Sequence, residues 1–276
     1  MIATSRSLAG LMLVSLLVGC AARNKPSAEI EPLLPAQDQA AVQGTDLRIA
    51  NSALQSGDLG LAQKTYARLV KTSPDMAEAW QGLGDTQYQA GQLEAAKDTY
   101  NQAKQRFPDL TAPSLALARI DVRQRKLDEA AGYYQAILAQ HPDDPEALAG
   151  LGATMDLRGD SSQAQAIYRR GLAKNPDDAA LRTNLGLSLA LNGNPREAIN
   201  VLLGVSGLSG KLPQERANLA LAYGLLGRDD AAESILTSDL PQSVAQDNIE
   251  FYHYVRERLD TKGPARTVPS KGSVKP

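Results

Sequence analysis

A period of 34 residues runs through most of the sequence and constrains the fold more than any other feature. The same residue types return at this step for six copies, so that ladders of Ala, Tyr and Pro stand at fixed offsets. A fixed period of this length is typical of stacked helical hairpins, so the sequence predicts an all-α repeat array. The ladders are Ala62, Ala96, Ala130, Ala164, Ala198 and Ala232; Tyr66, Tyr100, Tyr134 and Tyr168; and Pro74, Pro108, Pro142 and Pro176.

Each copy is expected to hold two helices joined at a residue without a side chain. A Gly stands at this joint in five copies, where a backbone with no Cβ turns at the lowest cost. The third copy has Arg125 instead, so its turn should be less comfortable. The five glycines are Gly57, Gly91, Gly159, Gly193 and Gly227.

Packing within and between copies is predicted from the remaining ladders. A Leu or Ile of the first helix is followed by a small residue, as in Leu83-Gly84, which lets the second helix come close. The laddered Ala faces this seam, and the laddered Tyr fills the space between neighbouring copies. No copy buries its apolar face alone, so stability must come from stacking. The first ladder is Ile49, Leu83, Leu117, Leu151, Leu185 and Leu219.

The second copy carries a specific resemblance. Its residues resemble the tetratricopeptide repeat, which implies a right-handed α-solenoid of six repeats over residues 43–241. Gln87 departs from the consensus aromatic, with Tyr88 one place beyond, and Leu202 and Leu236 replace the laddered Tyr in the last two copies, which also lack the closing Pro. The matching residues are Trp80, Leu83-Gly84, Gly91, Ala96, Tyr100, Ala103 and Pro108.

Residues 1–19 are predicted to be an export signal. Arg6 precedes an apolar run from Leu8 to Val18, and this run is shorter than the about 20 apolar residues of a membrane span. Leu17-Val18-Gly19-Cys20 resembles the bacterial lipoprotein box, which implies cleavage before Cys20, a diacylglyceryl group on its thiol and an acylated amine. The alternative is an ordinary signal with an incidental Cys. Cys20 is the only cysteine of the chain, so no intrachain disulfide is expected.

Ala21 and the segment that follows bear on location. In the lipoprotein family an Asp after the lipidated Cys favours the inner membrane, so Ala21 points to the outer membrane, with the protein on its periplasmic face. Residues 20–42 contain Pro26, Pro32 and Pro35 and are expected to form the lipid anchor and an extended tether. No cofactor is expected apart from the covalent lipid on Cys20.

The first helix of each copy lines the inner face of a solenoid in this repeat family. The register places polar residues there in the early copies and leucines in the later ones, a surface suited to an extended or helical peptide. The alternative is that adjacent helices or the C-terminal segment cover many of these leucines. The groove candidates are Asn51, Asp85, Tyr88, Gln89, Arg119, Arg123, Leu157, Leu187, Leu191, Leu221 and Leu225.

A further amphipathic helix is expected over residues 242–260, where the period has ended. Ile249, Tyr252, Val255 and Leu259 share one stripe, so this helix is the candidate C-terminal cap. Phe251 and Tyr254 lie beside the stripe, and we expect them to widen the cap contact, with partner contact as the alternative. Residues 261–276 are predicted to be a disordered, basic tail.

The sequence contains no catalytic or metal-binding constellation. Its two histidines, His141 and His253, are isolated in sequence, and Gly150-Leu151-Gly152 lies inside a predicted helix rather than after a strand. A net charge of −2 argues against nucleic acid as a partner. We therefore expect a scaffold that binds proteins, not an enzyme, and no small-molecule substrate. An enzyme with an unrecognised site remains the alternative from a different class.

The last third of the chain carries a narrower resemblance. Asn184–Leu191, Asn218–Gly224, Asp239-Leu240-Pro241 and Asn248 resemble the TadD family, tetratricopeptide lipoproteins of the tight-adherence (Flp) pilus machinery. This implies a pilotin-like helper of the secretin in pilus assembly and secretion, with the secretin and other Tad components as partners. The alternatives in the same class are a type IV pilus pilotin and a general envelope adaptor that docks peptidoglycan enzymes.

Replacing the single cysteine tests the lipid anchor. Cys20→Ser removes the thiol that would carry the diacylglyceryl group, and buried acyl chains contribute about 0.8 kcal/mol per methylene to membrane binding. We expect the variant to be absent from the washed outer-membrane fraction. Immunoblotting of fractionated cells measures this. A variant that still sediments with the outer membrane would contradict lipid anchoring.

Overall fold

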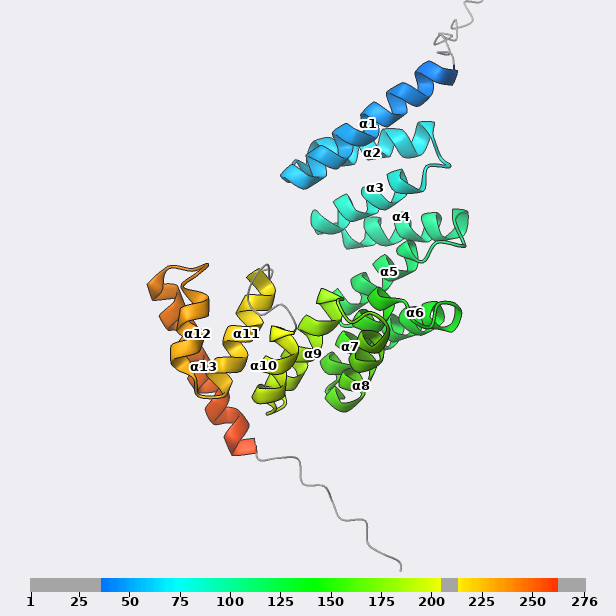
Figure 1. The fold of residues 1–276 in the computed structure, drawn as a ribbon. Helices are drawn as coiled ribbons and strands as arrows, with labels where there is room; N and C mark the ends of the chain where they lie inside the picture. The colour runs from blue at the N-terminus through cyan, green and yellow to red at the C-terminus, as the bar shows by residue number, and fades with distance from the viewer. Residues whose placement is uncertain (1–35, 205–212, 263–276) are drawn as a thin grey trace, which may run out of the picture. The chain divides into compact units, whose positions relative to one another are not determined.

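The computed structural model describes residues 36–204 and 213–262, and within these ranges it contains thirteen α-helices and no strand (Figure 1). The predictions for residues 1–35, which include the signal and Cys20, and for the tail from 263 onward lie outside the described residues. The helices are α1 (Ala36–Ser56), α2 (Leu59–Thr72), α3 (Ala77–Gln89), α4 (Leu93–Arg106), α5 (Ala112–Arg123), α6 (Leu127–Gln140), α7 (Pro145–Arg158), α8 (Ser161–Lys174), α9 (Ala179–Leu191), α10 (Pro195–Leu203), α11 (Pro213–Leu225), α12 (Asp229–Leu236) and α13 (Gln242–Lys262).

Six helical hairpins follow one another, from α1–α2 to α11–α12, and α13 comes last. The second helix of each hairpin packs against the first helix of its own copy and against the first helix of the next: α4, for example, contacts both α3 and α5. The all-α array of six repeats is therefore confirmed. Each interface joins helices that are consecutive in the chain, within a copy and between neighbouring copies, which is how a solenoid builds a continuous core from units that have none alone.

The laddered tyrosines lie between successive first helices. Tyr66 of α2 is buried against Gly82 of α3, where an added Cβ would stand 2.3 Å from the ring. Tyr100 of α4 has the same relation to Gly84 within its own copy, again at 2.3 Å. Real Cβ atoms do not approach that closely, so the full aromatic ring fits at these two helix positions only because they carry Gly.

The Ala ladder and the aliphatic ladder complete the core. All six laddered alanines have 0% exposure. Leu83, Leu117, Leu151, Leu185 and Leu219 are buried, but Ile49 of α1, the first member of the same ladder, is 43% exposed. The reason is position: each later member is covered by the preceding copy, and no described hairpin precedes α1.

The joints within the copies have the backbone geometry that Gly favours. The five predicted glycines have φ between 75° and 88°. Arg125 replaces Gly in the third copy and still adopts φ 61°, the one positive φ of a non-Gly residue in the described ranges. Arg125 thus adopts the backbone conformation on which the prediction of a less comfortable turn rests, and a left-handed conformation costs an L-residue roughly 1–2 kcal/mol.

Aspartates begin several first helices. The Asp144 side chain accepts a hydrogen bond from the Ala147 N–H at 2.8 Å, and Pro145 follows it at the first helical position. Asp178 accepts from the Leu181 N–H at 2.8 Å in the next copy. These caps stabilise helix starts by about 1 kcal/mol each and fix where a new copy begins.

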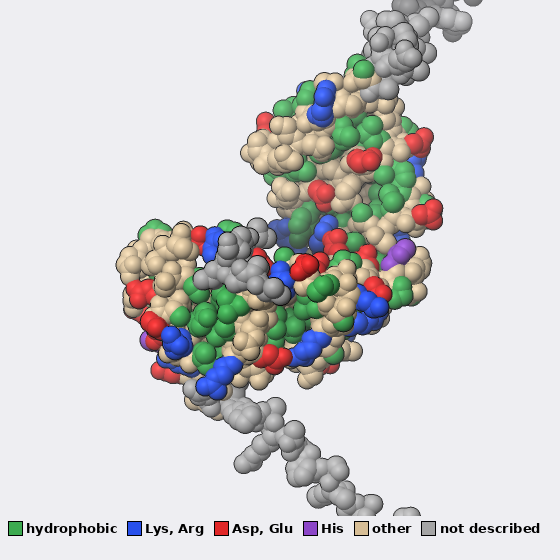
Figure 2. Space-filling view, in the orientation of Figure 1, with side chains coloured by type: hydrophobic (Ala, Val, Ile, Leu, Met, Phe, Trp, Pro, Cys, Tyr) green, Lys and Arg blue, Asp and Glu red, His purple; other side chains and the backbone are tan. Residues whose placement is uncertain are grey.

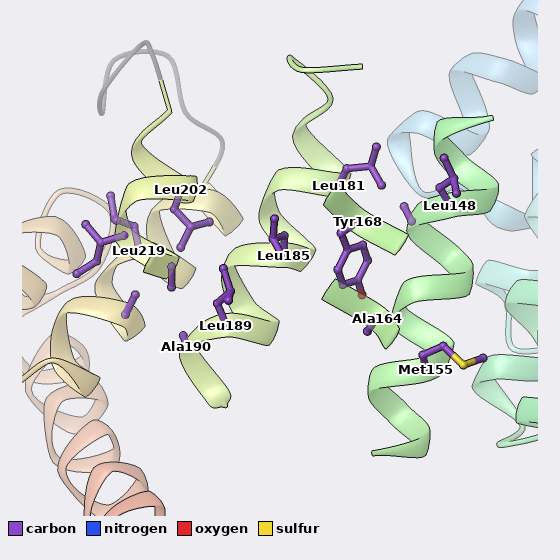
Figure 3. Packing of buried hydrophobic residues seen from close by; sticks show 14 of the residues in the cluster. Leu148, Met155, Ala164, Tyr168, Leu181, Leu185, Leu189, Ala190, Leu202 and Leu219 are labelled. Atoms are coloured by element: carbon purple, nitrogen blue, oxygen red, sulfur yellow. The ribbon is translucent and has the colours of Figure 1, made fainter. Parts of the chain in front are cut away.

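The second helices of the last two copies are shorter than those of the earlier copies. α10 has 9 residues and α12 has 8, whereas α2 has 14. Leu202 and Leu236 replace the laddered Tyr and remain buried, and Leu202 packs on Gly186. Figure 3 shows Tyr168 and Leu202 in the row of buried side chains that crosses from copy to copy. The smaller Leu side chain thus occupies the position of the laddered Tyr in the two copies whose second helices are shorter.

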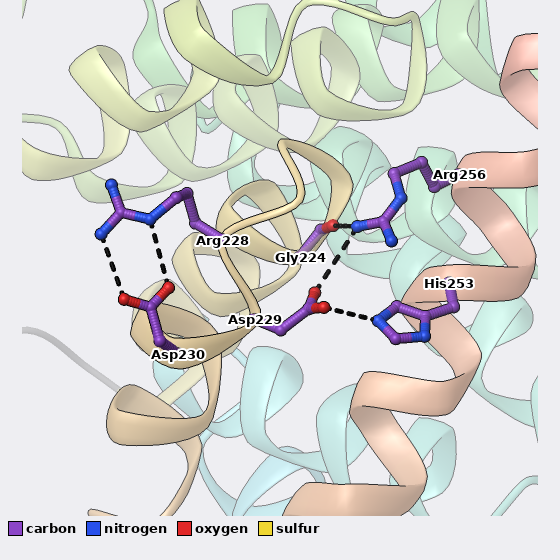
Figure 4. A network of polar contacts seen from close by, with 6 residues as sticks. All are labelled: Gly224, Arg228, Asp229, Asp230, His253 and Arg256. Atoms are coloured by element: carbon purple, nitrogen blue, oxygen red, sulfur yellow. Dashed lines mark hydrogen bonds and ion pairs between the residues drawn. The ribbon is translucent and has the colours of Figure 1, made fainter.

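Helix α13 covers the last hairpin, as predicted for a cap. Ile249 and Tyr252 are buried, and Tyr252 packs on Gly224 of α11. Polar contacts fix the helix in place: the His253 ring lies 2.7 Å from an Asp229 carboxylate oxygen, and Arg256 donates to the Gly224 carbonyl at 2.7 Å (Figure 4).

Two expectations at the ends of the array are wrong. Phe251 and Tyr254 do not widen the cap contact, because their side chains are 55% and 52% exposed. The extended tether predicted over residues 20–42 is wrong for residues 36–42, because α1 begins at Ala36, and its remaining part lies outside the described residues. The last prolines of that segment precede Ala36, so nothing in the sequence from there on opposes a helix.

Replacing Arg125 with Gly should stabilise the protein. The substitution removes the left-handed strain, partly offset by the larger entropy of Gly in the unfolded chain, so we expect a gain of about 1 kcal/mol in the free energy of unfolding. Urea denaturation measures this as a higher midpoint.

The matched control is Gly91→Arg at the same position of the second copy. A Cβ on Gly91 meets no atom within 4 Å, so only the backbone conformation opposes the substitution. We expect a loss of about 1 kcal/mol. Equal stability of Arg125→Gly and the parent chain, with Gly91→Arg also neutral, would contradict the strain at this joint.

Candidate functional site

Equivalent positions of α1, α3 and α5 form a polar row. Asn51, Asp85 and Arg119 are spaced by 34 residues and were predicted to line the groove. Asn51 accepts a hydrogen bond from the hydroxyl of the buried Tyr66, and Asp85 accepts one from Tyr100 at 2.6 Å. The tyrosines that hold the copies together therefore also orient the polar groups of this row.

Asp85 is the centre of this row. Gln81 donates from its amide nitrogen to both Asp85 oxygens at 3.1 Å, and Arg119 lies 4.0 Å from the same carboxylate. Arg119 also pairs with Glu146 of α7 at 2.9 Å, so this guanidinium is shared between two carboxylates. Burial is the main cause that raises the pKa of the Tyr100 hydroxyl, and the hydrogen bond to Asp85 raises it further. This hydroxyl therefore stays protonated and donates to Asp85.

A pocket of about 430 Å³ opens beside Asp85. We call it the Asp85 pocket. Its walls come from α1, Tyr66 of α2, α3, the end of α4, the α4–α5 connection and the start of α5, and they combine apolar side chains with two carboxylates. The lining residues are Leu47, Asn51, Leu54, Tyr66, Ala77, Glu78, Gln81, Gly82, Asp85, Ala103, Phe107, Leu110, Ala112 and Pro113.

Tyr88 and Arg123 form a second predicted group on α3 and α5. The Arg123 guanidinium lies over the Tyr88 ring at 5.0 Å from its centroid and donates to the Tyr88 carbonyl at 3.3 Å. This cation–π pair joins two neighbouring copies. Gln89 and Arg123 are exposed and Tyr88 is half-buried, and none of the three lines the Asp85 pocket.

The predicted leucines of the later copies differ in exposure. Leu157 and Leu191 are exposed, and Leu187 and Leu221 are half-buried. Leu225 is only 6% exposed and belongs to the hydrophobic core, so its prediction as a groove residue is wrong. It lies at the end of α11, where the cap helix packs against the last hairpin.

Several residues of the pocket were not predicted from the sequence. Leu47 and Gln81 lie one helical turn before Asn51 and Asp85 and in the same register as each other, which is a signal that could have identified them. Phe107 and Leu110 come from the connection between α4 and α5, whose path the period does not fix. The Asp85 pocket is thus made partly by a loop.

The described residues offer no sign of metal chemistry or of a membrane span. In residues 36–204 and 213–262, no group of three or more His, Cys, Asp and Glu side chains is arranged to hold a metal ion. No helix in this part of the chain has the length and apolarity to cross a bilayer. Figure 2 shows acidic and basic side chains interspersed on the face drawn, rather than gathered into one field.

Comparison with known proteins places the repeats. Models described as tetratricopeptide repeat match residues 47–110 and 121–186. No curated protein matches the sequence. The chain thus contains tetratricopeptide repeats, and its fold is an all-α tetratricopeptide-repeat solenoid. Such repeats imply a scaffold for protein–protein interaction. The tetratricopeptide-repeat fold is typically non-catalytic.

Three solved structures are similar in fold. The APC/C hetero-tetramer Cut9–Hcn1 has a TM-score of 0.63 at 20% identity; the match covers 79% of this chain, which spans 42% of that one. A tetratricopeptide repeat protein from Parabacteroides merdae has 0.58 at 19%, covering 83% of this chain and 94% of that one. Pseudomonas aeruginosa pilF has 0.60 at 14%, covering 79% and 99%. At these identities the likeness concerns the fold.

Removing the Tyr134 hydroxyl should reduce the loss of stability at high pH. Burial raises the pKa of Tyr134 to about 12, against the opposing effect of Arg119. The folded pKa lies above the unfolded one near 10, so the stabilisation is complete below pH 10 and is lost as the pH rises toward 12. Each pKa unit corresponds to about 1.4 kcal/mol.

We therefore expect Tyr134→Phe to lose less free energy of unfolding than the parent chain between about pH 8 and about pH 11. Urea denaturation at both pH values measures this difference. Tyr254→Phe removes an exposed phenol and serves as the control. An equal alkaline loss in the parent chain and in Tyr134→Phe would show that burial of this phenol does not govern the pH dependence.

Proposed function

We propose that this tetratricopeptide-repeat solenoid is a lipid-anchored scaffold on the periplasmic face of the outer membrane, where it binds a component of the Flp (Tad) pilus machinery as a pilotin-like helper of the secretin. The observation that carries the binding role is the Asp85 pocket, which joins α1, α3 and α5 in one polar and apolar surface. The lipoprotein box around Cys20 and the TadD resemblance of the last copies support the location and the machinery.

The geometry supports binding of a polypeptide rather than chemistry on a small molecule. The pocket is open to solvent, and most of its lining comes from the first helices α1, α3 and α5. The Tyr88–Arg123 pair and the exposed Leu191 also lie on first helices, so the proposed partner contacts several copies. Contacts spread over several copies are typical of peptide recognition by helical repeats. The described residues around Asp85 include no His or Cys to act as base or nucleophile.

A photo-crosslinking amino acid placed in living cells tests this function. We expect crosslinks from Tyr88, Arg123 or Leu191, replaced one at a time, to join the protein to the secretin or to another Tad component, identified by mass spectrometry. Gln105 is exposed on the second helix α4 and is the matched control, which should give little of the same product.

Two outcomes would overturn parts of the proposal. If peptidoglycan enzymes are captured in place of pilus components, the general envelope adaptor is the correct function. If Gln105 yields the same products as the three first-helix positions, the inner surface is not where the partner binds.

A further inference from the structure

The charges of the Asp85 pocket are one-sided. Its lining contains the carboxylates of Glu78 and Asp85 and no Lys, Arg or His. Glu78 is exposed and forms no ion pair within the part of the chain that the structure describes. The nearest cation, Arg119, is at 4.0 Å from Asp85 but closer to Glu146, at 2.9 Å. The field inside the pocket is therefore negative and attracts a cation.

The Asp85 carboxylate is held in position and still has capacity to accept hydrogen bonds. Tyr100 and Gln81 both donate to its Oδ1, while Gln81 alone donates to Oδ2 within hydrogen-bond range. The side chain is 34% exposed, so a ligand can reach it. Because each carboxylate oxygen has two lone pairs, Oδ2 has room for one more donor. A carboxylate fixed before binding loses little entropy on pairing.

The remaining walls suit an aliphatic stem. Leu47 and Leu54 come from α1 and are partly buried, and Phe107 and Leu110 line another part of the wall. Lys and Arg bury their methylene groups along apolar surface while the charged head reaches a polar partner. Partial exclusion of water by these walls also strengthens an ion pair with Asp85. Apolar neighbours of the basic residue would find the same walls.

We propose that the Asp85 pocket binds a Lys or Arg side chain of a partner polypeptide, flanked by apolar residues. This assignment rests on the proposed function and names the chemistry of its partner segment. Glu78 and Asp85 pair with the charged head, and the leucines of α1 with Phe107 and Leu110 contact the stem and its neighbours. An acidic segment would meet like charges there and is rejected.

A random-peptide library displayed on phage tests the assignment without a known partner. We expect the full-length chain to enrich peptides with Lys or Arg between apolar residues. Glu78→Lys leaves Asp85 as the one carboxylate of the lining and places a cation beside it, so the enrichment of basic residues should disappear. Peptides with no enriched basic residue, or an unchanged preference in Glu78→Lys, would overturn the proposal.

Asp85→Asn gives the quantitative arm. Asn51 already accepts a tyrosine hydroxyl at the same position of the first copy, so an Asn at 85 can keep the bond to Tyr100 and the fold. We expect the affinity for an enriched, fluorescein-labelled peptide to fall about tenfold or more by fluorescence anisotropy. Glu129→Gln, an exposed acid of α6 outside the pocket, is the control and should leave the affinity unchanged.

The result separates this proposal from the proposed function. If crosslinks to a pilus component persist while Asp85→Asn binds the selected peptide as tightly as the parent chain, the scaffold function stands and the basic-residue assignment fails. A synthetic peptide of residues 263–276, which contains Arg266, Lys271 and Lys275, tests the chain's own tail. If it binds more tightly than the selected peptides, the tail is the occupant and the partner assignment is overturned.

Discussion

The contact between a buried aromatic ring and a helix backbone without a side chain governs this structure. Tyr66 on Gly82 and Tyr134 on Gly150 each join one copy to the next, while Tyr168 on Gly152 closes a hairpin within its copy. A Cβ at any of these glycines would lie 2.3 Å from the ring. A large side chain on one helix and a Gly on the facing helix must therefore occur together, and this pairing determines how closely the helices approach at these seams.

The same tyrosines connect the core to the binding surface. Their rings fill the seams, and the hydroxyls of Tyr66 and Tyr100 emerge at Asn51 and Asp85, where they set the direction of the polar side chains. Replacing such a ring would thus disturb packing and recognition together. Tyr134 differs, because Arg119 stands where the earlier copies have an acceptor, and Arg119 is turned toward Glu146. The polar row consequently changes sign at the third copy.

The sequence predicted what repeats and failed where the repeat ends or is interrupted. The hairpins and the joint at Arg125 follow from the 34-residue ladders, and the cap helix follows from its apolar stripe. Leu225 was wrongly assigned to the groove because the 34-residue period does not determine which side of α11 the cap helix α13 covers. Phe251 was misplaced because residues one position off an apolar stripe can face either way. Phe107 and Leu110 of the pocket lie in a connection, where no periodic pattern acts.

The exposure of Ile49 shows that the two ends of the array are not equivalent. Helix α13 covers the last hairpin, whereas no described helix covers the outer side of α1. Ile49 is therefore exposed, while every later member of its ladder is buried. In a chain held together by nearest neighbours, the unit with one neighbour opens first. We therefore expect the amide hydrogens of α1 to exchange faster than those of the first helices of the interior copies.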